Sequence, residues 1–227
     1  MYSFFLVVMC RFREAVAEGK RALVRRSDAQ HAGRAAGSKR AGNFVGSESR
    51  RLCNPFSLRI SQHLAYALYC QRSYDEAIQQ YRKALELDPN DASVCEALGN
   101  AHERNGEYRE AVEQWTRAML LANDTELVPT LRAAKTKENV DSAVRGVAAK
   151  RLDRLLRNRE RGDYVPAIRF ARQHLRAGHQ EEALKWLTLA CEERNVYSLM
   201  IASDPFYDPL RADQHFAKLL RRMKLDA

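Results

Sequence analysis

Two stretches of the chain match one another when one of them is shifted by 34 residues. The matched positions keep their size and apolar character: Leu64 with Leu98, Ala65 with Gly99, Ala77 with Ala111, Tyr81 with Trp115, and Ala84 with Ala118. A period of this length, with small residues at fixed places, is typical of a repeated pair of antiparallel helices. Because one pair cannot bury its own apolar face, such pairs stack on their neighbours. The period therefore predicts an all-α, right-handed array of stacked helix pairs.

The same period predicts how the rest of the chain is divided. The expected units are a truncated half-repeat at 1–23, a basic insert at 24–56, helix pairs at 57–90, 91–124, 125–162 and 163–196, and a C-terminal cap at 197–227. The pair at 125–162 is degenerate, and its second half has the pattern of a long basic amphipathic helix from Val140 to Arg159. We expect the cap to end in one helix that covers the open end of the stack.

Three positions carry the signals that are expected at helix ends. Asp88-Pro89 ends the first pair, because proline disfavours helix at the residue before it. Gly106 stands where the first helix of the second pair should end with a left-handed residue. Asp204-Pro205 places an aspartate before a helix start and a proline at the first helical position.

The basic insert interrupts the period near the start of the chain. It is rich in Gly, Arg and Ser and has few large apolar side chains, so we expect it to be disordered. Residues 1–60 contain twelve Lys/Arg and four Asp/Glu, whereas residues 61–227 contain 26 and 25. Nearly all of the net charge of +9 therefore precedes the helix pairs. The half-repeat before the insert indicates either a fragment of a longer protein or a misassigned start.

Cysteine usage and hydropathy indicate the environment of the protein. Five widely spaced cysteines without a C-x-x-C pair favour neither a disulfide framework nor a metal site. Cys70, Cys95 and Cys191 lie in helical patterns, where free cysteine packs as a small apolar residue. The apolar start at 1–10 is shorter than the roughly 20 residues that a membrane-spanning helix needs. We therefore expect a cytoplasmic protein and no membrane span in this chain.

The residues at the repeated positions resemble the tetratricopeptide repeat (TPR) family. The first pair reads Ser61-x2-Leu64-Ala65-x2-Leu68 … Ala77-x3-Tyr81-x2-Ala84 … Pro89, and the second reads Cys95-x2-Leu98-Gly99-x2-His102 … Ala111-x3-Trp115-x2-Ala118. Serine replaces the usual tryptophan of the family in the first pair, and Asn123 replaces the proline in the second. The resemblance implies a TPR-type superhelix with a C-terminal capping helix, and a function in protein binding rather than catalysis.

The C-terminal part resembles the TPR tails of bacterial multidomain regulators, kinases and nucleotide cyclases. The similar residues are Gly178, Ala183-Leu184, Trp186-Leu187, Ala190-Cys191-Glu192-Glu193-Arg194 and Asp204-Pro205-Phe206-Tyr207-Asp208-Pro209-Leu210-Arg211. This similarity implies a detached or standalone sensor module. The sequence has no kinase signature and no glycine-rich nucleotide-binding motif.

The TPR resemblance also implies where a partner binds, because TPR arrays hold ligands in a concave groove lined by the first helix of each pair. The groove positions that packing does not require are Gln62, Tyr66 and Tyr69 in the first repeat and Glu96, Asn100 and Glu103 in the second. Tyrosines beside amide and carboxylate groups suit a peptide, because tyrosine offers contact area at low entropic cost. The alternative is that these side chains are only solvated helix surface. In TPR proteins that grip a C-terminal carboxylate, lysine and asparagine occupy these places, so we expect no carboxylate clamp here.

The histidines and carboxylates do not predict a catalytic or metal site. Six histidines are scattered without the paired spacing of metal ligands. His102 and His174 align with Leu68, which favours a packing role for both. We therefore expect no metal, no cofactor and no catalytic residue.

Two hypotheses of function remain open. The first is a non-enzymatic scaffold or sensor module that binds a partner protein or peptide in the concave groove. The second is the detached C-terminal part of a bacterial signalling or transcription regulator, with nucleic-acid contact through the basic N-terminal segment. Phe44 is the only Phe, Trp or Tyr between Arg25 and Arg51, and this scarcity does not favour nucleic acid as a partner.

Overall fold

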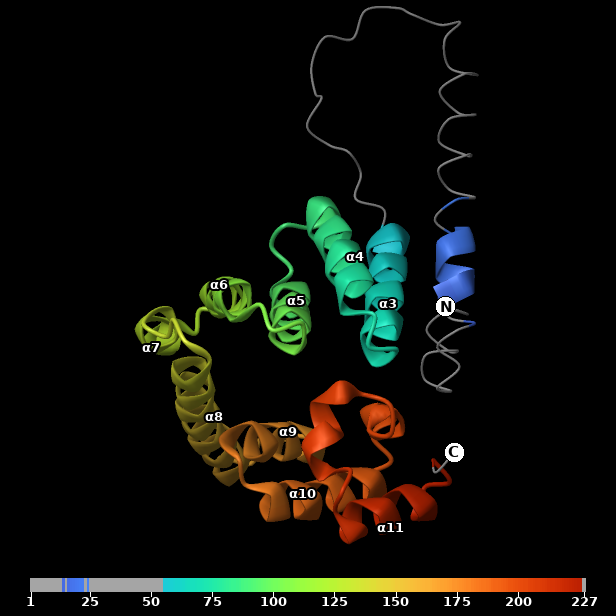
Figure 1. Ribbon diagram of the computed structural model, residues 1–227. Helices are drawn as coiled ribbons and strands as arrows, with labels where there is room; N and C mark the ends of the chain where they lie inside the picture. Colours follow the sequence, from blue (N-terminus) through green and yellow to red (C-terminus); the bar gives the residue numbers. More distant parts are fainter. Residues whose placement is uncertain (1–13, 15, 23, 25–54, 226–227) are drawn as a thin grey trace, which may run out of the picture.

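The computed structural model describes residue 14, residues 16–22, residue 24 and residues 55–225. All regular elements in these parts of the chain are helices, which confirms the predicted all-α fold (Figure 1). The insert predicted at 24–56 lies almost wholly outside the described residues. None of the described helices is both long and apolar enough to cross a membrane.

The first two helix pairs follow the predicted period. They are α3 (Pro55–Cys70) with α4 (Tyr74–Leu87), and α5 (Ala92–Arg104) with α6 (Tyr108–Leu121). The turn inside each pair needs a left-handed residue, and the φ angle is 81° at Gly106 and 62° at Arg72, its equivalent in the first pair. The prediction for Gly106 is confirmed. Arg72 adopts a backbone conformation that is unfavourable for any residue with a Cβ atom.

The core of the two pairs is built from the repeated positions, with one difference between them. A Cβ atom added at Gly99 would lie 2.5 Å from Trp115 Cδ1, so only glycine fits against this indole. In the first pair the equivalent residues are Ala65 and Tyr81, and both belong to one buried cluster. A larger ring in the second pair is therefore matched by a smaller residue facing it.

A short N-terminal helical stretch lies beside α3, as α4 lies beside α5 (Figure 1). Its Val16 packs against the buried cluster of the first pair. A Cβ atom at Gly19 would approach Leu64 Cβ to 3.2 Å, which places the two backbones close together. Lys20 Nζ also lies 3.1 Å from Glu76 Oε2 of α4. Residues 1–13, 15 and 23 of the half-repeat predicted at 1–23 lie outside the described residues.

The two halves of the third pair differ in length. The short helices η1 (Thr125–Leu127) and α7 (Val128–Arg132) occupy the place of its first helix, and α8 (Lys137–Glu160) is 24 residues long. The long helix predicted from Val140 is confirmed, but it begins three residues earlier. The side chain of Thr136 causes the earlier start, because it accepts a hydrogen bond from the backbone N–H of Asn139 at 3.4 Å.

The last part of the chain, 167–225, is called here the C-terminal unit. It consists of α9 (Ala167–Ala177), α10 (Gln180–Glu192), η2 (Val196–Met200), η3 (Pro205–Leu210) and α11 (Gln214–Arg222). Figure 1 shows that the array curves round, so that this unit faces α3 and α5 across its inner side. Arg72 of the first pair forms an ion pair with Asp208 of η3 at 2.7 Å. The C-terminal unit therefore contacts the start of the array as well as its end.

Candidate partner-binding cleft

A cleft lies on the concave side of the array, between α3 and the C-terminal unit. Its larger cavity, of about 590 Å³, is lined by Arg59, Gln62, His63, Tyr66, Tyr69, Tyr81, Asp91, Ser93, Val94, Ala97, Asn100, Arg172, Tyr197, Met200 and Asp204. A second cavity of about 310 Å³ adjoins it and shares Tyr66, Arg172, Tyr197, Met200 and Asp204 with it. We call the two together the open cleft.

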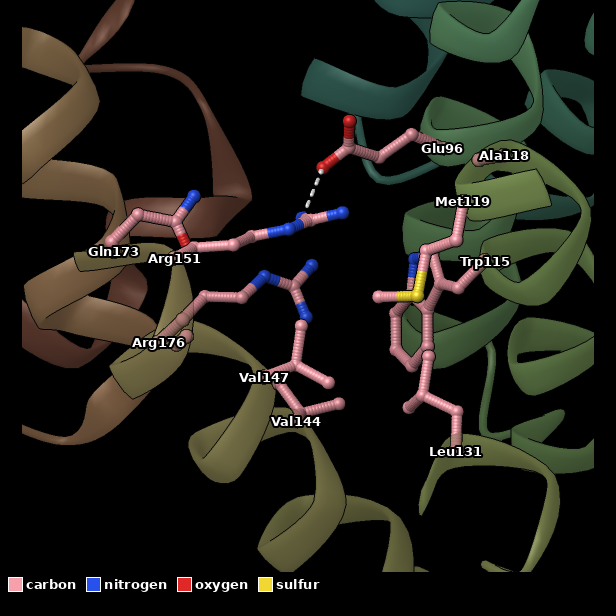
Figure 2. Close-up of a pocket in the computed structure, with 11 residues that line it drawn as sticks. Glu96, Trp115, Ala118, Met119, Leu131, Val144, Val147, Arg151, Gln173 and Arg176 are labelled. Atoms are coloured by element: carbon pink, nitrogen blue, oxygen red, sulfur yellow. Dashed lines mark ion pairs between the residues drawn. The ribbon is translucent and has the colours of Figure 1, made fainter. Parts of the chain in front are cut away.

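The structure separates the six groove residues predicted from the sequence into two groups. Gln62, Tyr66, Tyr69 and Asn100 line the open cleft. Glu96 lies instead in a small cavity beside Trp115 and Met119 (Figure 2). Glu103 lies in a fourth cavity, on the other side of Arg176. The six residues all line cavities on the inner side, but these do not form one continuous groove.

On α3, the polar side chains face the open cleft. Tyr66 Oη donates a hydrogen bond to Asp204 Oδ2 at 3.0 Å, and Gln62 Nε2 donates one to Asp91 Oδ2 at 2.7 Å. Burial, assisted by the charge of Asp204, raises the pKa of Tyr66, so its phenol stays protonated and acts as a donor. Tyr69 is only 5% exposed and stacks against Tyr66 with ring centroids 6.3 Å apart. Tyr69 therefore serves the core more than the cleft surface.

On α5, arginines from later helices form ion pairs with side chains at two of the equivalent positions. Arg151 of α8 lies 3.7 Å from Glu96, and Arg176 of α9 lies 3.6 Å from Glu103. Asn100 Oδ1 accepts hydrogen bonds from Trp115 Nε1 at 3.0 Å and from Arg176. Figure 2 shows Arg151 and Arg176 extending side by side into this cavity from the C-terminal half of the chain. Arg151 and Arg176 thus contact the side of α5 that carries Glu96 and Glu103, while Ser93, Ala97 and Asn100 of the same helix line the open cleft.

Arg176 makes several different contacts on the inner side of α5. Its guanidinium carbon lies 4.9 Å from the ring centroid of Trp115 and 5.4 Å from that of Phe206. Only 16% of its side chain is exposed. A cation between two aromatic rings and a carboxylate is well stabilised, because the rings and the charge replace the water that it loses.

Several residues of the cleft could not be assigned from the repeat pattern. Asp204 was predicted as a helix cap, and its Oδ1 does accept a hydrogen bond from the backbone N–H of Phe206 at 2.8 Å. Its second oxygen takes the Tyr66 hydroxyl, from a residue far away in the sequence. Arg172, Arg176 and Tyr197 also lie outside the first helices of the two clear pairs. Their only sequence signal is that arginine and tyrosine are common where proteins make contacts.

Metal binding finds no support in the part of the chain that the structure describes, where no three His, Cys, Asp or Glu side chains gather as ligands. His102, which was expected to pack, is 1% exposed. Its Nδ1 contacts the carboxylate of Glu107, and this hydrogen bond is the main reason why the pKa of Glu107 is lowered. His102 is therefore held as part of the turn between α5 and α6.

Comparison with protein families now gives the repeat its name. The TPR repeat family matches residues 65–106, and the tetratricopeptide repeat family matches residues 94–129. The chain is a tetratricopeptide repeat protein. The two matches run from α3 into α7, and TPRs generally mediate protein–protein interactions. No curated protein matches the chain, and the resemblance of its C-terminal part to bacterial regulators stays a prediction.

Proposed function

We propose that this TPR protein is a non-enzymatic interaction module that takes a segment of a partner protein into the open cleft. The observation that carries the proposal is the cavity of about 590 Å³ beside the inner face of α3, which the described residues leave unfilled. Glu103 of α5, by contrast, is contacted by Arg176. A partner segment therefore has room along α3 and η2 and beside Ala97 and Asn100 of α5, but not where Arg176 contacts Glu103.

The side chains around the open cleft are suited to a peptide. Tyr197 is 59% exposed and lines both cavities, so a partner would bury most of its ring. Tyrosine combines a large apolar face with a hydroxyl, and such side chains contribute strongly to protein interfaces. Gln62 and Asn100 add amide groups that can hydrogen-bond to a peptide backbone.

Photo-crosslinking in the cells that make the protein tests the proposal. A photoreactive phenylalanine analogue is placed at Tyr197, and in a matched control at Tyr164, which is 77% exposed and does not line the cleft. We expect a discrete protein adduct from position 197 and none, or a weaker one, from position 164. Equal adducts from both positions, or an adduct from 164 alone, would show that the partner binds elsewhere.

A further inference from the structure

The open cleft has a charge character that the nearly neutral repeat surface does not predict. Three arginines line it: Arg59 of α3 in the larger cavity, Arg169 of α9 in the smaller one, and Arg172 of α9 in both. Resting on the proposed function, we infer that the partner segment is an acidic peptide that carries a large apolar side chain. The inference depends on which hydrogen-bonding groups of the cleft are already used.

The two acidic residues of the cleft are engaged by the protein. Asp91 caps α5 by accepting from the N–H groups of Ser93 at 2.9 Å and Val94 at 3.1 Å, and its other oxygen accepts from Gln62. Asp204 accepts from Phe206 N–H with one oxygen and from Tyr66 Oη with the other. Both carboxylates therefore have little capacity left to attract a basic ligand.

The donors of the cleft are still available. In the described part of the chain, the side chains of Arg59 and Arg169 form no ion pair or hydrogen bond, and both are exposed. Asn100 lines the same cleft, and because its oxygen accepts from Trp115 and Arg176, its NH₂ group is the part left for a ligand. A site rich in free donors is complementary to a ligand that brings acceptors, and carboxylates accept most strongly.

Arg172 stands where the two cavities meet. Its guanidinium lies 3.7 Å from Asp204 and 4.3 Å from the ring centroid of Phe206. Burial alone would lower the pKa of Arg172, but Tyr207 and Asp204 raise it, so the side chain stays charged. A guanidinium has five N–H donors, and Asp204 uses few of them at this distance. Arg172 therefore provides a fixed cation between the outer arginines.

The smaller cavity provides the apolar part of the site. Pro166, Ile168, Met200 and Tyr197 line it together with Arg169 and Arg172. Burying one large apolar side chain there would favour binding, because it removes apolar surface from water. The ligand that fits both features has an apolar residue for this cavity and acidic residues on either side of it.

Fluorescence anisotropy with three labelled octapeptides tests the inference on the full chain. The acidic probe has Leu-Phe at its centre and glutamates on both sides, and the two matched probes carry glutamines or lysines in place of the glutamates. We expect the acidic probe to bind about tenfold more tightly than the glutamine probe, because three partly exposed ion pairs contribute up to about fivefold each. The preference should shrink at high salt.

Charge reversal locates the effect in the cleft. In the double variant Arg59→Glu/Arg169→Glu, the preference for the acidic probe should disappear and the lysine probe should bind better. The matched control is Arg132→Glu, an exposed arginine of α7 outside the cleft, which should bind like the wild type. Thermal unfolding of each variant checks that lost binding does not come from lost structure.

Each other outcome overturns the inference in a recognisable way. If the glutamine or lysine probe binds as tightly as the acidic one, the charge preference is wrong, while protein binding through the cleft stands. If no probe binds, the acidic peptide is wrong, and the crosslink at position 197 decides the proposed function by itself. If a thymidine oligonucleotide displaces the acidic probe at a lower concentration than unlabelled peptide does, the cleft recognises phosphates and not a peptide.

Discussion

The inner faces of α3 and α5 occupy equivalent places in two consecutive repeats, yet they contact different parts of the protein. On α3, Gln62 and Tyr66 line a cavity of about 590 Å³. On α5, Glu96 and Glu103 are paired with arginines of α8 and α9. The repeat makes the two backbones alike, and the later helices make their surroundings different.

Charge explains why Arg151 and Arg176 of the later helices contact α5 and not α3. The second repeat has two glutamates at positions where the first has Gln62 and Tyr69, so it attracts Arg151 and Arg176. The first repeat contacts two aspartates of the C-terminal unit instead. Tyr66 donates a hydrogen bond to Asp204, and Arg72 donates one to Asp208. A repeat period thus predicts which side chains point inward, whereas accessibility depends on the charge of distant segments.

The largest expected effect comes from exchanging the small residues that distinguish the two repeats. Gly99→Ala should lower the free energy of unfolding by about 2 kcal/mol, because the new Cβ atom would overlap the Trp115 indole. The matched change Ala65→Gly should cost about 1 kcal/mol through helix propensity, to which the loss of a buried methyl group adds, but it causes no steric overlap. Urea unfolding of both variants measures the difference. If Gly99→Ala were as stable as the wild type, the close contact with Trp115 would be wrong.

The second prediction concerns the contacts of Arg176 with α5. Arg176→Met should lower the free energy of unfolding by about 1 kcal/mol, because it leaves Glu103 without its ion pair and removes a donor from Asn100. Amide hydrogen exchange should accelerate along α5 and stay unchanged along α3. Arg169→Met, on the same helix, serves as the control and should change neither quantity. Faster exchange along α3 as well would mean that the two inner faces are not independent.

The third prediction uses the acid sensitivity of the α3 side of the cleft. Burial, with help from the charge of Arg59, lowers the pKa of His63 from 6.5 to about 4. Since the unfolded chain then binds a proton that the folded chain refuses, His63 makes the protein less stable as the pH falls from 6.5 to 4. The variant His63→Gln should therefore lose less stability than the wild type between pH 7 and pH 4.5.

Unfolding at the two pH values, with the exposed His215→Gln as control, measures this difference. A His63→Gln variant with the same pH dependence as the wild type would show that His63 is not held neutral. Arg59→Glu should in addition raise the pKa of His63, which NMR titration can follow.

The smallest effect concerns the turn that the two repeats share. Arg72→Gly should raise the free energy of unfolding by about 0.5 kcal/mol, because relief of the left-handed backbone exceeds the loss of the exposed ion pair with Asp208. Arg72→Gln keeps the backbone cost and loses the pair, so it should be slightly destabilising at low salt. If Arg72→Gly were less stable than the wild type, the ion pair would outweigh the strain.

Much of the array could be predicted because it depends on local pattern. The 34-residue match located α3 to α6, and Gly106 was placed correctly because a left-handed turn residue has a strong sequence signal. The long helix α8 was predicted from the spacing of its apolar residues, and only its first turn was missed. These features need nothing from distant parts of the chain.

The contacts on the inner side could not be predicted, because they do not depend on local pattern. Arg176 reads as an ordinary polar residue of an amphipathic helix, and its contacts with Asn100 and Trp115 join parts of the chain that no motif connects. Tyr69 was placed among the free groove positions, because the pattern does not reveal that Tyr66 and Tyr74 pack around it. Contacts between side chains, and not local helix propensity, decide both.

A crosslinking map of the bound acidic probe tests the central claim most directly, namely that a ligand lies in the open cleft beside α3 and η2. The probe carries a benzophenone in place of its phenylalanine, and mass spectrometry locates the adducts on the full chain. We predict adducts within 58–70 of α3 and 197–204 around η2, where Tyr66, Tyr197 and Met200 line the cleft. Adducts found only around Glu103 and Arg176, or on the outer faces of α4 and α6, would contradict the account.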